Sequence, residues 1–565
     1  MATSSHLNLY KSEAVGERGM LATKHPLASA AGVAMLEAGG NAVDAAVAAC
    51  LAVGVVEPGM SGIGGGGYMM VAIGNRVDAV AFQMQAPASA TPDMFTLSGE
   101  PTTGVFEWAG VVGDENLLGP RSIAIPGAVA GLSLALERFG TMPWKEVIQP
   151  AIRLARDGFE IGWYDLYAIG GEIPRILSNA EATRIFLSNG GLPVGDGISP
   201  YMFRQPDLAS TLERLAEAGP RDFYEGDVAR EIVAGLRELD GILTLDDLTG
   251  YRADVVPPVR SAYRGVLVCV PPFACAGPTT VATLNTYRHF EPAALGHESA
   301  ERLHAYICAS RLARADRMAY FADPEKVDGP WEGMVSSGYA LERASLIGSD
   351  AVPEFDPGDP WDYQSGDGAA RSDGQHGPEG STTHLCAADA GGNMVSLTNT
   401  VMAGFGSGVV PRGTGIVMNN GMMWFNPVPG FPNSVSPLAK GLNNMTPAVV
   451  LDGDRPLMAV GATGGRRITN AVSQIISNVV DHDMGIQAAI AAPRVDCSTD
   501  TTDIDDRYPS SVVRALRDRG HQVNPLHESF RAGFGTFASP TGILRADGEL
   551  RGGVDPFHVA EARGV

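Results

Sequence analysis

The chain lacks a long hydrophobic run and an excess of positive charge. Its longest apolar stretch, residues 45–56, is too short to cross a bilayer, and the N-terminus lacks the charged and apolar regions of a signal peptide. The 41 basic and 64 acidic residues give a net charge of −23, which disfavours nucleic acid or an anionic membrane as a partner. We therefore expect a cytoplasmic protein with no nucleic-acid or membrane partner.

Cysteine is also scarce, and no metal-binding pattern is visible. The six cysteines show neither CxxC nor zinc spacing, and the eleven histidines include no HExxH. Reduced core thiols are expected rather than a disulfide framework, and the sequence predicts no metal and no cofactor. Cys386 lies near the candidate nucleophile described below, but the sequence pairs it with no base, so we expect it to serve in packing.

The length and composition indicate a large, turn-rich globular protein. The chain has 565 residues, of which 45% are hydrophobic and 70 are glycine. A chain of this size buries a substantial core, either in one very large domain or in two intertwined ones.

Residues 380–401 contain the most informative pattern. Two strand-like runs, 382–388 and 394–401, flank turn residues near Gly391, which predicts a β-hairpin. Antiparallel pairing would set Thr382 opposite Thr400, with Cβ atoms about 5 Å apart. Two hydroxyl groups would then meet.

A threonine hydroxyl becomes a nucleophile only when a base adjoins it. The threonine's own α-amine, with a pKa of about 8, is one such base. Thr382 gains a free amine only if the Ser381–Thr382 peptide bond is cut. The same hydroxyl can make that cut by attacking the Ser381 carbonyl, so the sequence predicts maturation into two chains.

The N-terminal region reads as two helices followed by a glycine run. Residues 26–38 begin with proline and end at two glycines, and Asn41 with Asp44 begins a second, alanine-rich helix to about residue 56. The run 61–67 formally contains G-x-G-x-x-G, but a helix precedes it and a strand follows, the reverse of a dinucleotide site. We interpret these glycines as a close approach to another strand or to the active-site cavity.

The middle of the chain is mainly helical and ends in a linker. Residues 121–347 include amphipathic runs at 143–156 and 227–239 and a strand pair near 251–270. Residues 352–380 are rich in Pro, Gly, Asp and Ser, which predicts a linker ahead of Thr382.

A second glycine cluster follows the hairpin. The strand-like residues 457–460 lead into glycines at 461, 464 and 465, and an amphipathic helix is expected at 468–480, with a shorter one at 510–518. Strand, glycines and helix in this order present backbone N–H groups to an anion, which in a hydrolase can be the tetrahedral oxyanion. A phosphate loop is excluded because the Gly-Lys-Ser/Thr ending is missing.

Ser381-Thr382-Thr383-His384, with Thr400 eighteen positions after Thr382, resembles the processing site of the γ-glutamyltranspeptidases (gamma-glutamyltransferases), members of the N-terminal-nucleophile hydrolases. The stretches 39–46 and 64–67 are similar to that family's N-terminal signature. The resemblance implies an α+β fold, the four-layer αββα sandwich. It also implies autocatalytic cleavage into a heterodimer of a large subunit, residues 1–381 with the acidic linker 352–380, and a small catalytic subunit, residues 382–565.

The resemblance also implies roles for particular residues. Thr382 would be nucleophile and base, Thr400 its hydroxyl partner, and Gly464 with Gly465 the oxyanion hole. An acyl ester on Thr382 would be resolved by water or by an amine acceptor.

Three departures from the family's pattern concern substrate binding. Gln83 stands where the family has a carboxylate-binding arginine, and a neutral amide cannot supply bidentate, charge-assisted pairing. Gly421 and Trp424, after Asn420, replace the groups that hold the α-ammonium, and Asn443 with Asn444 replaces a serine pair. The loop between residues 425 and 443 is short for the family's lid. These changes suggest an acyl group that is not a free amino acid.

Several functions stay open at this stage. We expect an autoprocessed amide hydrolase acting on a small molecule whose acyl group is less zwitterionic than that of glutathione. A γ-glutamyltranspeptidase or glutathione hydrolase, or a cephalosporin (glutaryl) acylase, is the alternative if Arg466 or Arg467 supplies a carboxylate contact. A non-catalytic binding homologue is disfavoured by the intact Thr382, Thr400, Gly464 and Gly465.

Overall fold

The predicted hairpin forms the centre of the molecule. The computed structural model describes residues 9–101, 108–195, 199–365, 381–528 and 536–565. Within it, β12 (Ser381–Asp389) pairs antiparallel with β13 (Met394–Met402). The turn between them is closed by a hydrogen bond from the Asp389 N–H to the Asn393 carbonyl, so the hairpin is confirmed.

The hairpin belongs to a seven-stranded sheet with the order β21-β2-β12-β13-β3-β4-β9. Its other strands are β2 (Gly19–Thr23), β3 (Gly66–Ile73), β4 (Arg76–Phe82), β9 (Asp254–Val256) and β21 (Glu561–Gly564). The glycine run that leads into β3 and forms its start lies against β13, because a Cβ atom on Gly65 would collide with the Thr400 carbonyl and one on Gly67 with the Thr398 carbonyl. The predicted close approach of two strands is therefore confirmed.

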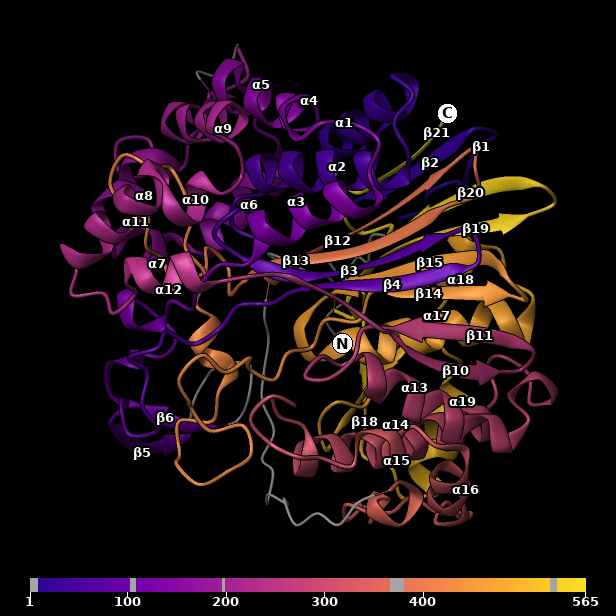
Figure 1. Cartoon of the computed structure of the whole chain (residues 1–565). Helices are drawn as coiled ribbons and strands as arrows, with labels where there is room; N and C mark the ends of the chain where they lie inside the picture. Colours follow the sequence, from indigo (N-terminus) through magenta and orange to yellow (C-terminus); the bar gives the residue numbers. More distant parts are fainter. Residues whose placement is uncertain (1–8, 102–107, 196–198, 366–380, 529–535) are drawn as a thin grey trace, which may run out of the picture.

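A second seven-stranded sheet packs face to face on the first, and helices cover both outer faces (Figure 1). Its order is β1-β20-β19-β15-β14-β11-β10. Its strands are β1 (Ala14–Gly16), β10 (Val259–Tyr263), β11 (Val266–Val270), β14 (Ala448–Asp452), β15 (Arg455–Thr463), β19 (Ser539–Ala546) and β20 (Glu549–Val554). The four-layer αββα sandwich is thus confirmed.

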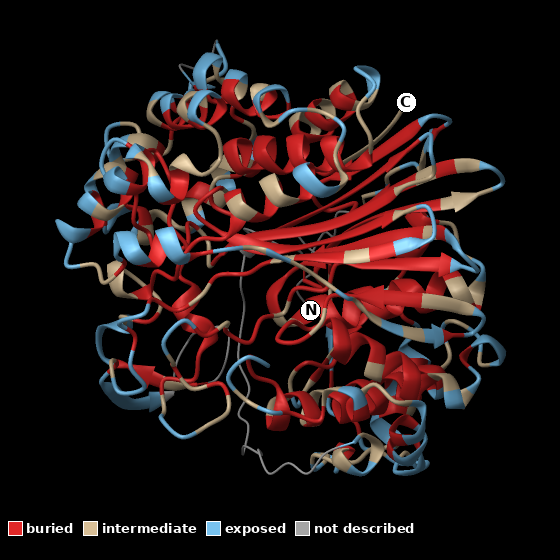
Figure 2. Ribbon diagram, viewed as in Figure 1, coloured by how far each residue is buried: buried red, intermediate tan, exposed pale blue. Residues whose placement is uncertain are grey.

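The helical layers follow from local sequence signals. In the first layer, α2 (Ala42–Val56) begins with a capping box in which Asn41 and Asp44 bond each other's backbone, and all of its residues are buried. The same layer contains α1 (Pro26–Glu37) and α3 (Ala128–Phe139), and the layer on the second sheet contains α13 (Gly277–Tyr287), α14 (Ala300–Tyr320), α17 (Ile468–His482) and α18 (Ile486–Ala491). Buried residues concentrate between the sheets and beneath these helices (Figure 2).

Smaller elements surround this sandwich. The other helices are α4 (Trp144–Val147), α5 (Gln149–Asp157), α6 (Trp163–Gly171), α7 (Ile173–Leu177), α8 (Ala180–Phe186), α9 (Pro206–Ala218), α10 (Asp222–Glu225), α11 (Asp227–Arg237), α12 (Leu245–Gly250), α15 (Trp331–Met334), α16 (Ser337–Ser345) and α19 (Ser510–Asp518). Small sheets are formed by β5 (Leu97–Pro101) with β6 (Ala109–Val111), by β7 (Phe159–Glu160) with β8 (Met202–Phe203), and by β16 (Val495–Asp496), β17 (Thr502–Asp505) and β18 (Val523–Leu526).

Both main sheets draw strands from both sides of the predicted cleavage point. In the first sheet, β12, β13 and β21 come from residues 382–565, apart from Ser381 at the start of β12, and the other four strands come from residues 1–381. In the second sheet, β14, β15, β19 and β20 come from the later segment and β1, β10 and β11 from the earlier one. The two predicted subunits are therefore interleaved rather than side by side.

Two predictions from the sequence differ from the structure, one of a helix and one of a linker. The run 143–156, predicted as one helix, is divided at Ile148 into α4 and α5, because Pro150 lacks the N–H needed to continue α4. The predicted linker 352–380 is in part anchored, since the Gly358 N–H donates to Asp316 and the Asp356 carbonyl accepts from Arg343. Residues 366–380 lie outside the described residues.

None of the helices in the described residues is long and apolar enough to span a membrane.

Candidate active site

The two predicted hydroxyl groups meet at the start of the hairpin. Thr382 Oγ1 donates to Thr400 Oγ1 over 3.2 Å, and the Met402 N–H donates to the same Thr400 oxygen over 2.8 Å. A register shift between Ser381 and Thr383 lets the Thr382 side chain reach across to β13. Both threonines are buried, so the pair lies in a confined space and its orientation is fixed.

A histidine and a cysteine continue the same face of β12, because alternate residues of a strand share a face. His384 Nδ1 lies 2.9 Å from Thr398 Oγ1, and Cys386 Sγ lies 3.4 Å from His384 Nε2. The expectation that Cys386 has no base beside it is therefore wrong. Burial nevertheless lowers the pKa of His384 to about 3 and raises that of the Cys386 thiol, so both groups stay neutral, and a packing role for Cys386 agrees with this.

The predicted oxyanion glycines end the strand that faces β12. Ser396, opposite Cys386, donates to the Val460 carbonyl over 3.0 Å, and a Cβ atom on Gly461 would collide with the His384 ring. Cys386 thus lies near Val460, and His384 lies against Gly461. Going back along β12 towards Thr382 therefore leads in the same direction as going forward along β15 towards Gly464. Thr382 and the two glycines consequently follow at the same end of the sandwich.

The backbone at these glycines is of the kind that only glycine adopts readily. Gly464 has φ 135° and Gly465 has φ 58°, in the region that disfavours side chains with a Cβ atom. Gly465 opens a short 3₁₀ turn (Gly465–Arg467) that leads into α17. Among the described residues, neither glycine N–H donates a hydrogen bond, as expected at a helix start. Two N–H groups are thus available to an anion.

Gln83 lies across the first sheet from the hydroxyl pair. Gly66 on β3 pairs with Thr400 on β13, and the next residue, Gly67, pairs with Phe82 on β4. Gln83, which follows Phe82, therefore lies opposite Gly66 and on the same face of the sheet as Thr400. The Tyr251 hydroxyl donates to the Gln83 carbonyl over 2.8 Å, and the residue is buried. The structure thus places Gln83 and Thr400 at the same sheet end, with an uncharged amide where a guanidinium was expected from the family.

Asn420 and Trp424 lie beside the end of β13. Asn420 Oδ1 accepts from the Ala403 N–H over 3.0 Å, and its Nδ2 donates to the Leu117 carbonyl over 2.9 Å. The following 3₁₀ turn (Gly421–Trp424) carries Trp424 into an apolar cluster. Members of this cluster include Tyr68, Met84, Phe273, Met402, Phe425 and Met445. Because Met402 is in register with Ser381, the cluster adjoins the cleavage point.

The asparagine pair is held by protein groups. Asn443 is fully buried, with Nδ2 donating to the Ala274 carbonyl and Oδ1 accepting from the Met445 N–H. Asn444 Oδ1 accepts from Arg317 over 3.0 Å. A direct role of this pair in substrate binding stays a prediction.

The two arginines after the glycines face a buried carboxylate. Arg466 Nη2 and Arg467 Nε lie 3.9 Å and 3.7 Å from Asp496 Oδ2. Asp496 also accepts from Asn470. A buried carboxylate within this distance compensates part of their positive charge. A contact between either arginine and a substrate carboxylate stays a prediction.

Sequence reasoning missed a group of buried ionisable side chains next to β15. Lys24 Nζ donates to Thr463 Oγ1 over 3.1 Å, and His558 Nε2 lies 3.6 Å from Glu57 Oε1. Burial lowers the pKa of Lys24 to about 8 and raises that of Glu57 to about 8. The only sequence signal was a charged residue flanking each of two apolar elements, β2 and α2.

A pocket lies on the helical side of β13, lined mainly by apolar side chains together with Glu57, Asp165 and Glu172. It includes Met60, whose carbonyl accepts from the Val401 N–H. None of the predicted site residues lines it. The hydroxyl pair faces the other sheet, so this pocket is separate from the candidate active site.

Comparison with known proteins gives one consistent result. A family model described as gamma-glutamyltranspeptidase matches residues 28–565. The chain is 35% identical over 520 residues to the glutathione hydrolase proenzyme of Bacillus subtilis strain 168, a match that covers 91% of this chain and 86% of that protein. It is 36% identical over 516 residues to the acylase ACY 1 proenzyme of Pseudomonas sp. strain V22, covering 91% and 88%.

Solved structures with similar folds carry related names. The crystal structure of cephalosporin acylase from Bacillus halodurans matches with a TM-score of 0.86 and 27% identity, covering 100% of this chain and 99% of that one. The γ-glutamyltranspeptidase of Helicobacter pylori matches with a TM-score of 0.53 and 30% identity, covering 62% of this chain and 94% of that one.

Proposed function

Since the chain belongs to the γ-glutamyltranspeptidase family of N-terminal-nucleophile hydrolases, we propose that it cuts its own Ser381–Thr382 bond and then hydrolyses a small-molecule amide through an acyl ester on Thr382. The observation that carries this proposal is the 3.2 Å contact between the Thr382 and Thr400 hydroxyl groups at the start of β12. The names of the relatives, which are proenzymes, also support processing.

The cut requires no other nucleophile. The Thr382 oxygen adds to the Ser381 carbonyl carbon, the bond to the Thr382 nitrogen breaks, and that nitrogen takes the hydroxyl proton. Water then hydrolyses the resulting ester and releases a Ser381 carboxylate and a free Thr382 amine. This amine is the base that the hydroxyl otherwise lacks.

Turnover uses the same groups. The amine takes the Thr382 proton as the oxygen attacks the substrate carbonyl, and it returns the proton to the leaving amine. Water then adds to the ester carbonyl, gives up a proton to the same amine, and releases the acid as the Thr382 oxygen regains its proton. Thr400, fixed by the Met402 N–H, orients the attacking oxygen. The Gly464 and Gly465 N–H groups stabilise the oxyanion, at about 3 kcal/mol per donor.

The acyl group that this site suits is not a zwitterionic γ-glutamyl. The neutral Gln83 occupies the place of the expected cation, and the apolar cluster that contains Met402 and Trp424 adjoins the cleavage point. An ammonium and a carboxylate buried there without partners would cost several kcal/mol. An apolar acyl group would instead gain from the same surroundings.

A cephalosporin-type acylase is the second candidate. It is supported by the similarity to the ACY 1 acylase proenzyme and by the fold match to the cephalosporin acylase of Bacillus halodurans. A dicarboxylic acyl group would require a cation, and Arg466 is already within 3.9 Å of Asp496. Glutathione hydrolysis, the activity named for the B. subtilis relative, would require the same kind of cation.

A panel of amides tests the proposal. Purified wild type, Thr382→Ala and, as a matched control, Thr383→Ala are assayed with simple acyl amides, a glutaryl amide, a γ-glutamyl anilide and glutathione. We expect two bands on a denaturing gel for wild type and Thr383→Ala, and one band near 59 kDa without activity for Thr382→Ala. Activity in Thr382→Ala would refute the nucleophile, a preference for γ-glutamyl substrates would refute the acyl assignment, and one inactive wild-type band would indicate a binding homologue.

A further inference from the structure

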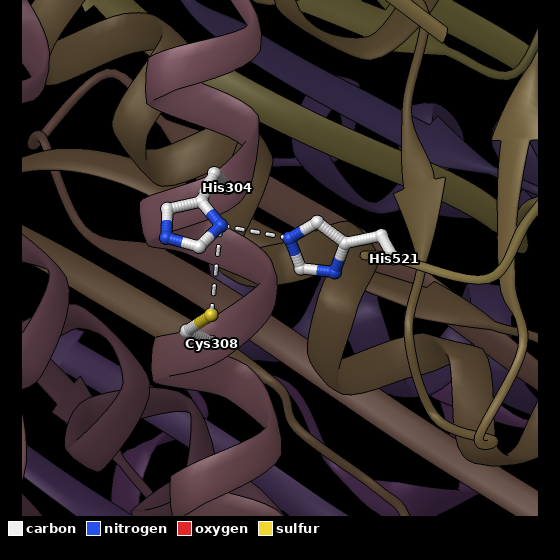
Figure 3. A group of neighbouring side chains, drawn as sticks. All are labelled: His304, Cys308 and His521. Carbon is white, nitrogen blue, oxygen red and sulfur yellow. Dashed lines mark hydrogen bonds between the residues drawn. The ribbon is translucent and has the colours of Figure 1, made fainter. Parts of the chain in front are cut away.

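Three buried side chains with metal-binding atoms converge away from the candidate active site. His304 and Cys308 are one turn apart on α14, and His521 lies just beyond the C-terminal end of α19 (Figure 3). Their donor atoms, one from each residue, all lie within 4.8 Å of one another. Neither cysteine spacing nor histidine spacing in the sequence indicated this group, because His521 is far from the other two along the chain.

The hydrogen bonding around His304 fixes which of its nitrogens faces the group. His304 Nε2 lies 2.9 Å from the Gly348 carbonyl, and a carbonyl only accepts, so Nε2 carries the hydrogen. The other nitrogen, Nδ1, therefore presents a lone pair to the group. A histidine whose second nitrogen donates to a backbone carbonyl is the usual arrangement of a metal ligand.

Two neighbours compete for that single lone pair. His521 Nε2 lies 2.8 Å and Cys308 Sγ lies 3.9 Å from His304 Nδ1. One of them can donate a proton to Nδ1, which leaves the other facing an occupied acceptor. Protons alone thus leave this cluster incompletely satisfied.

We infer that His304 Nδ1, Cys308 Sγ and His521 Nε2 form a site for a divalent cation of the zinc type, held by two imidazoles and one thiolate. With metal–nitrogen distances of about 2.0 Å and metal–sulfur distances of about 2.3 Å, neighbouring donors in a tetrahedral site are roughly 3.3–3.5 Å apart. The 3.9 Å sulfur–nitrogen separation is close to this, and the two imidazoles need to part by about half an ångström. The nearby cation Arg519 is paired with Glu301 at 3.1 Å.

The site joins the two segments on either side of the predicted cut. His304 and Cys308 precede residue 381, whereas His521 follows it. A bound cation is therefore a cross-link between the large and small chains, a role that depends on the proposed processing. Metal binding itself does not, because the same three residues are present in the uncut chain.

Zinc and cobalt measure the site directly. Full-length protein is reduced, treated with a chelator and then dialysed against Zn²⁺, and bound zinc is determined by elemental analysis. Co²⁺ serves as a spectroscopic probe because a thiolate ligand adds a charge-transfer band. Wild type, Cys308→Ala and His521→Gln are compared with Cys269→Ala, which removes a buried thiol from β11. The same measurements on Thr382→Ala separate failure of the site from failure of processing.

We expect one zinc per chain, and a cobalt–thiolate band that Zn²⁺ abolishes, in wild type, Cys269→Ala and Thr382→Ala. Cys308→Ala and His521→Gln should bind at least about 100-fold more weakly, since even an outer partner of a ligand is worth about 10–100-fold in affinity. A wild-type protein that takes up no zinc, or a Cys308→Ala protein that binds as wild type does, would overturn the inference.

Discussion

Gln83 is the residue whose substitution tests most directly which acyl group the site prefers. It is buried at the sheet end that also holds Thr400. We expect Gln83→Arg to raise kcat/KM for a γ-glutamyl anilide relative to a simple acyl amide by about 10–100-fold. The physical reason is that a hydrogen bond to a charged group contributes about 1.5–3 kcal/mol.

The control for this substitution is Gln83→Met, which has similar size and no charge. It should leave the ratio of the two kcat/KM values near that of wild type. An equal shift in both variants would mean that residue 83 acts through packing rather than through recognition of a carboxylate.

The buried carboxyl group of Glu57 should make the free energy of unfolding depend on pH. Burial raises its pKa from 4.5 to about 8, so the folded protein holds a proton that the unfolded chain releases above pH 4.5. The free energy of unfolding should therefore fall as the pH rises from about 5 to 8. At about 1.4 kcal/mol per pKa unit, this component amounts to at most about 5 kcal/mol.

Glu57→Gln removes this ionisation and keeps a side chain shaped like the protonated acid. Urea unfolding should give nearly equal stabilities for the variant and wild type at pH 5, and a more stable variant at pH 8. Glu137→Gln, on the exposed face of α3, should follow the wild-type profile. Parallel profiles for wild type and Glu57→Gln would show that Glu57 does not control this dependence.

At the scale of elements, the contact between β12 and β15 depends on one glycine. A Cβ atom on Gly461 would collide with His384, which is fully buried and bonded to Thr398. Overpacking of this kind costs about 1–3 kcal/mol, so Gly461→Ala should lower the free energy of unfolding by at least that amount in urea titrations. Gly250→Ala, where a Cβ atom meets nothing within 4 Å, should be neutral or slightly stabilising. Equal effects would argue against close packing of the two strands here.

Elements with strong local signals could be predicted from the sequence. The capping box fixed the start of α2, the apolar period identified α17, and the turn residues located the hairpin. Pro150 was the local signal overlooked between α4 and α5. The glycines at the start of β3 predicted a close approach, and those at the end of β15 predicted an anion site. The strands that lie against them depend on pairing that short-range patterns do not contain.

At the scale of the whole molecule, the interleaved sheets predict how the cut protein behaves. Each sheet contains strands from both segments, so separating the chains requires breaking both ladders. Native mass spectrometry of the processed protein should give one species near 59 kDa, and urea should release the two chains in a single transition. Two free chains under native conditions would contradict this arrangement.

Contacts between distant residues were the part of the site that the sequence did not reveal. Thr382 and Thr400 were predicted to meet because one turn connects them. Lys24 with Thr463, and His304 with His521, are brought together only by the stacking of layers. No spacing rule covers such separations, so the buried ionisable side chains and the His–Cys group became visible only in the folded chain.

The alternation of strands from the two segments also means that folding should precede cleavage. While the backbone is continuous, every strand of both sheets finds its neighbours within one molecule. After a cut before Thr382, refolding becomes an encounter between two separate fragments and slows with dilution. Cleavage is therefore irreversible with respect to folding, because the cut chains do not readily refold together. The functional lifetime of the mature protein is then set by its rate of unfolding.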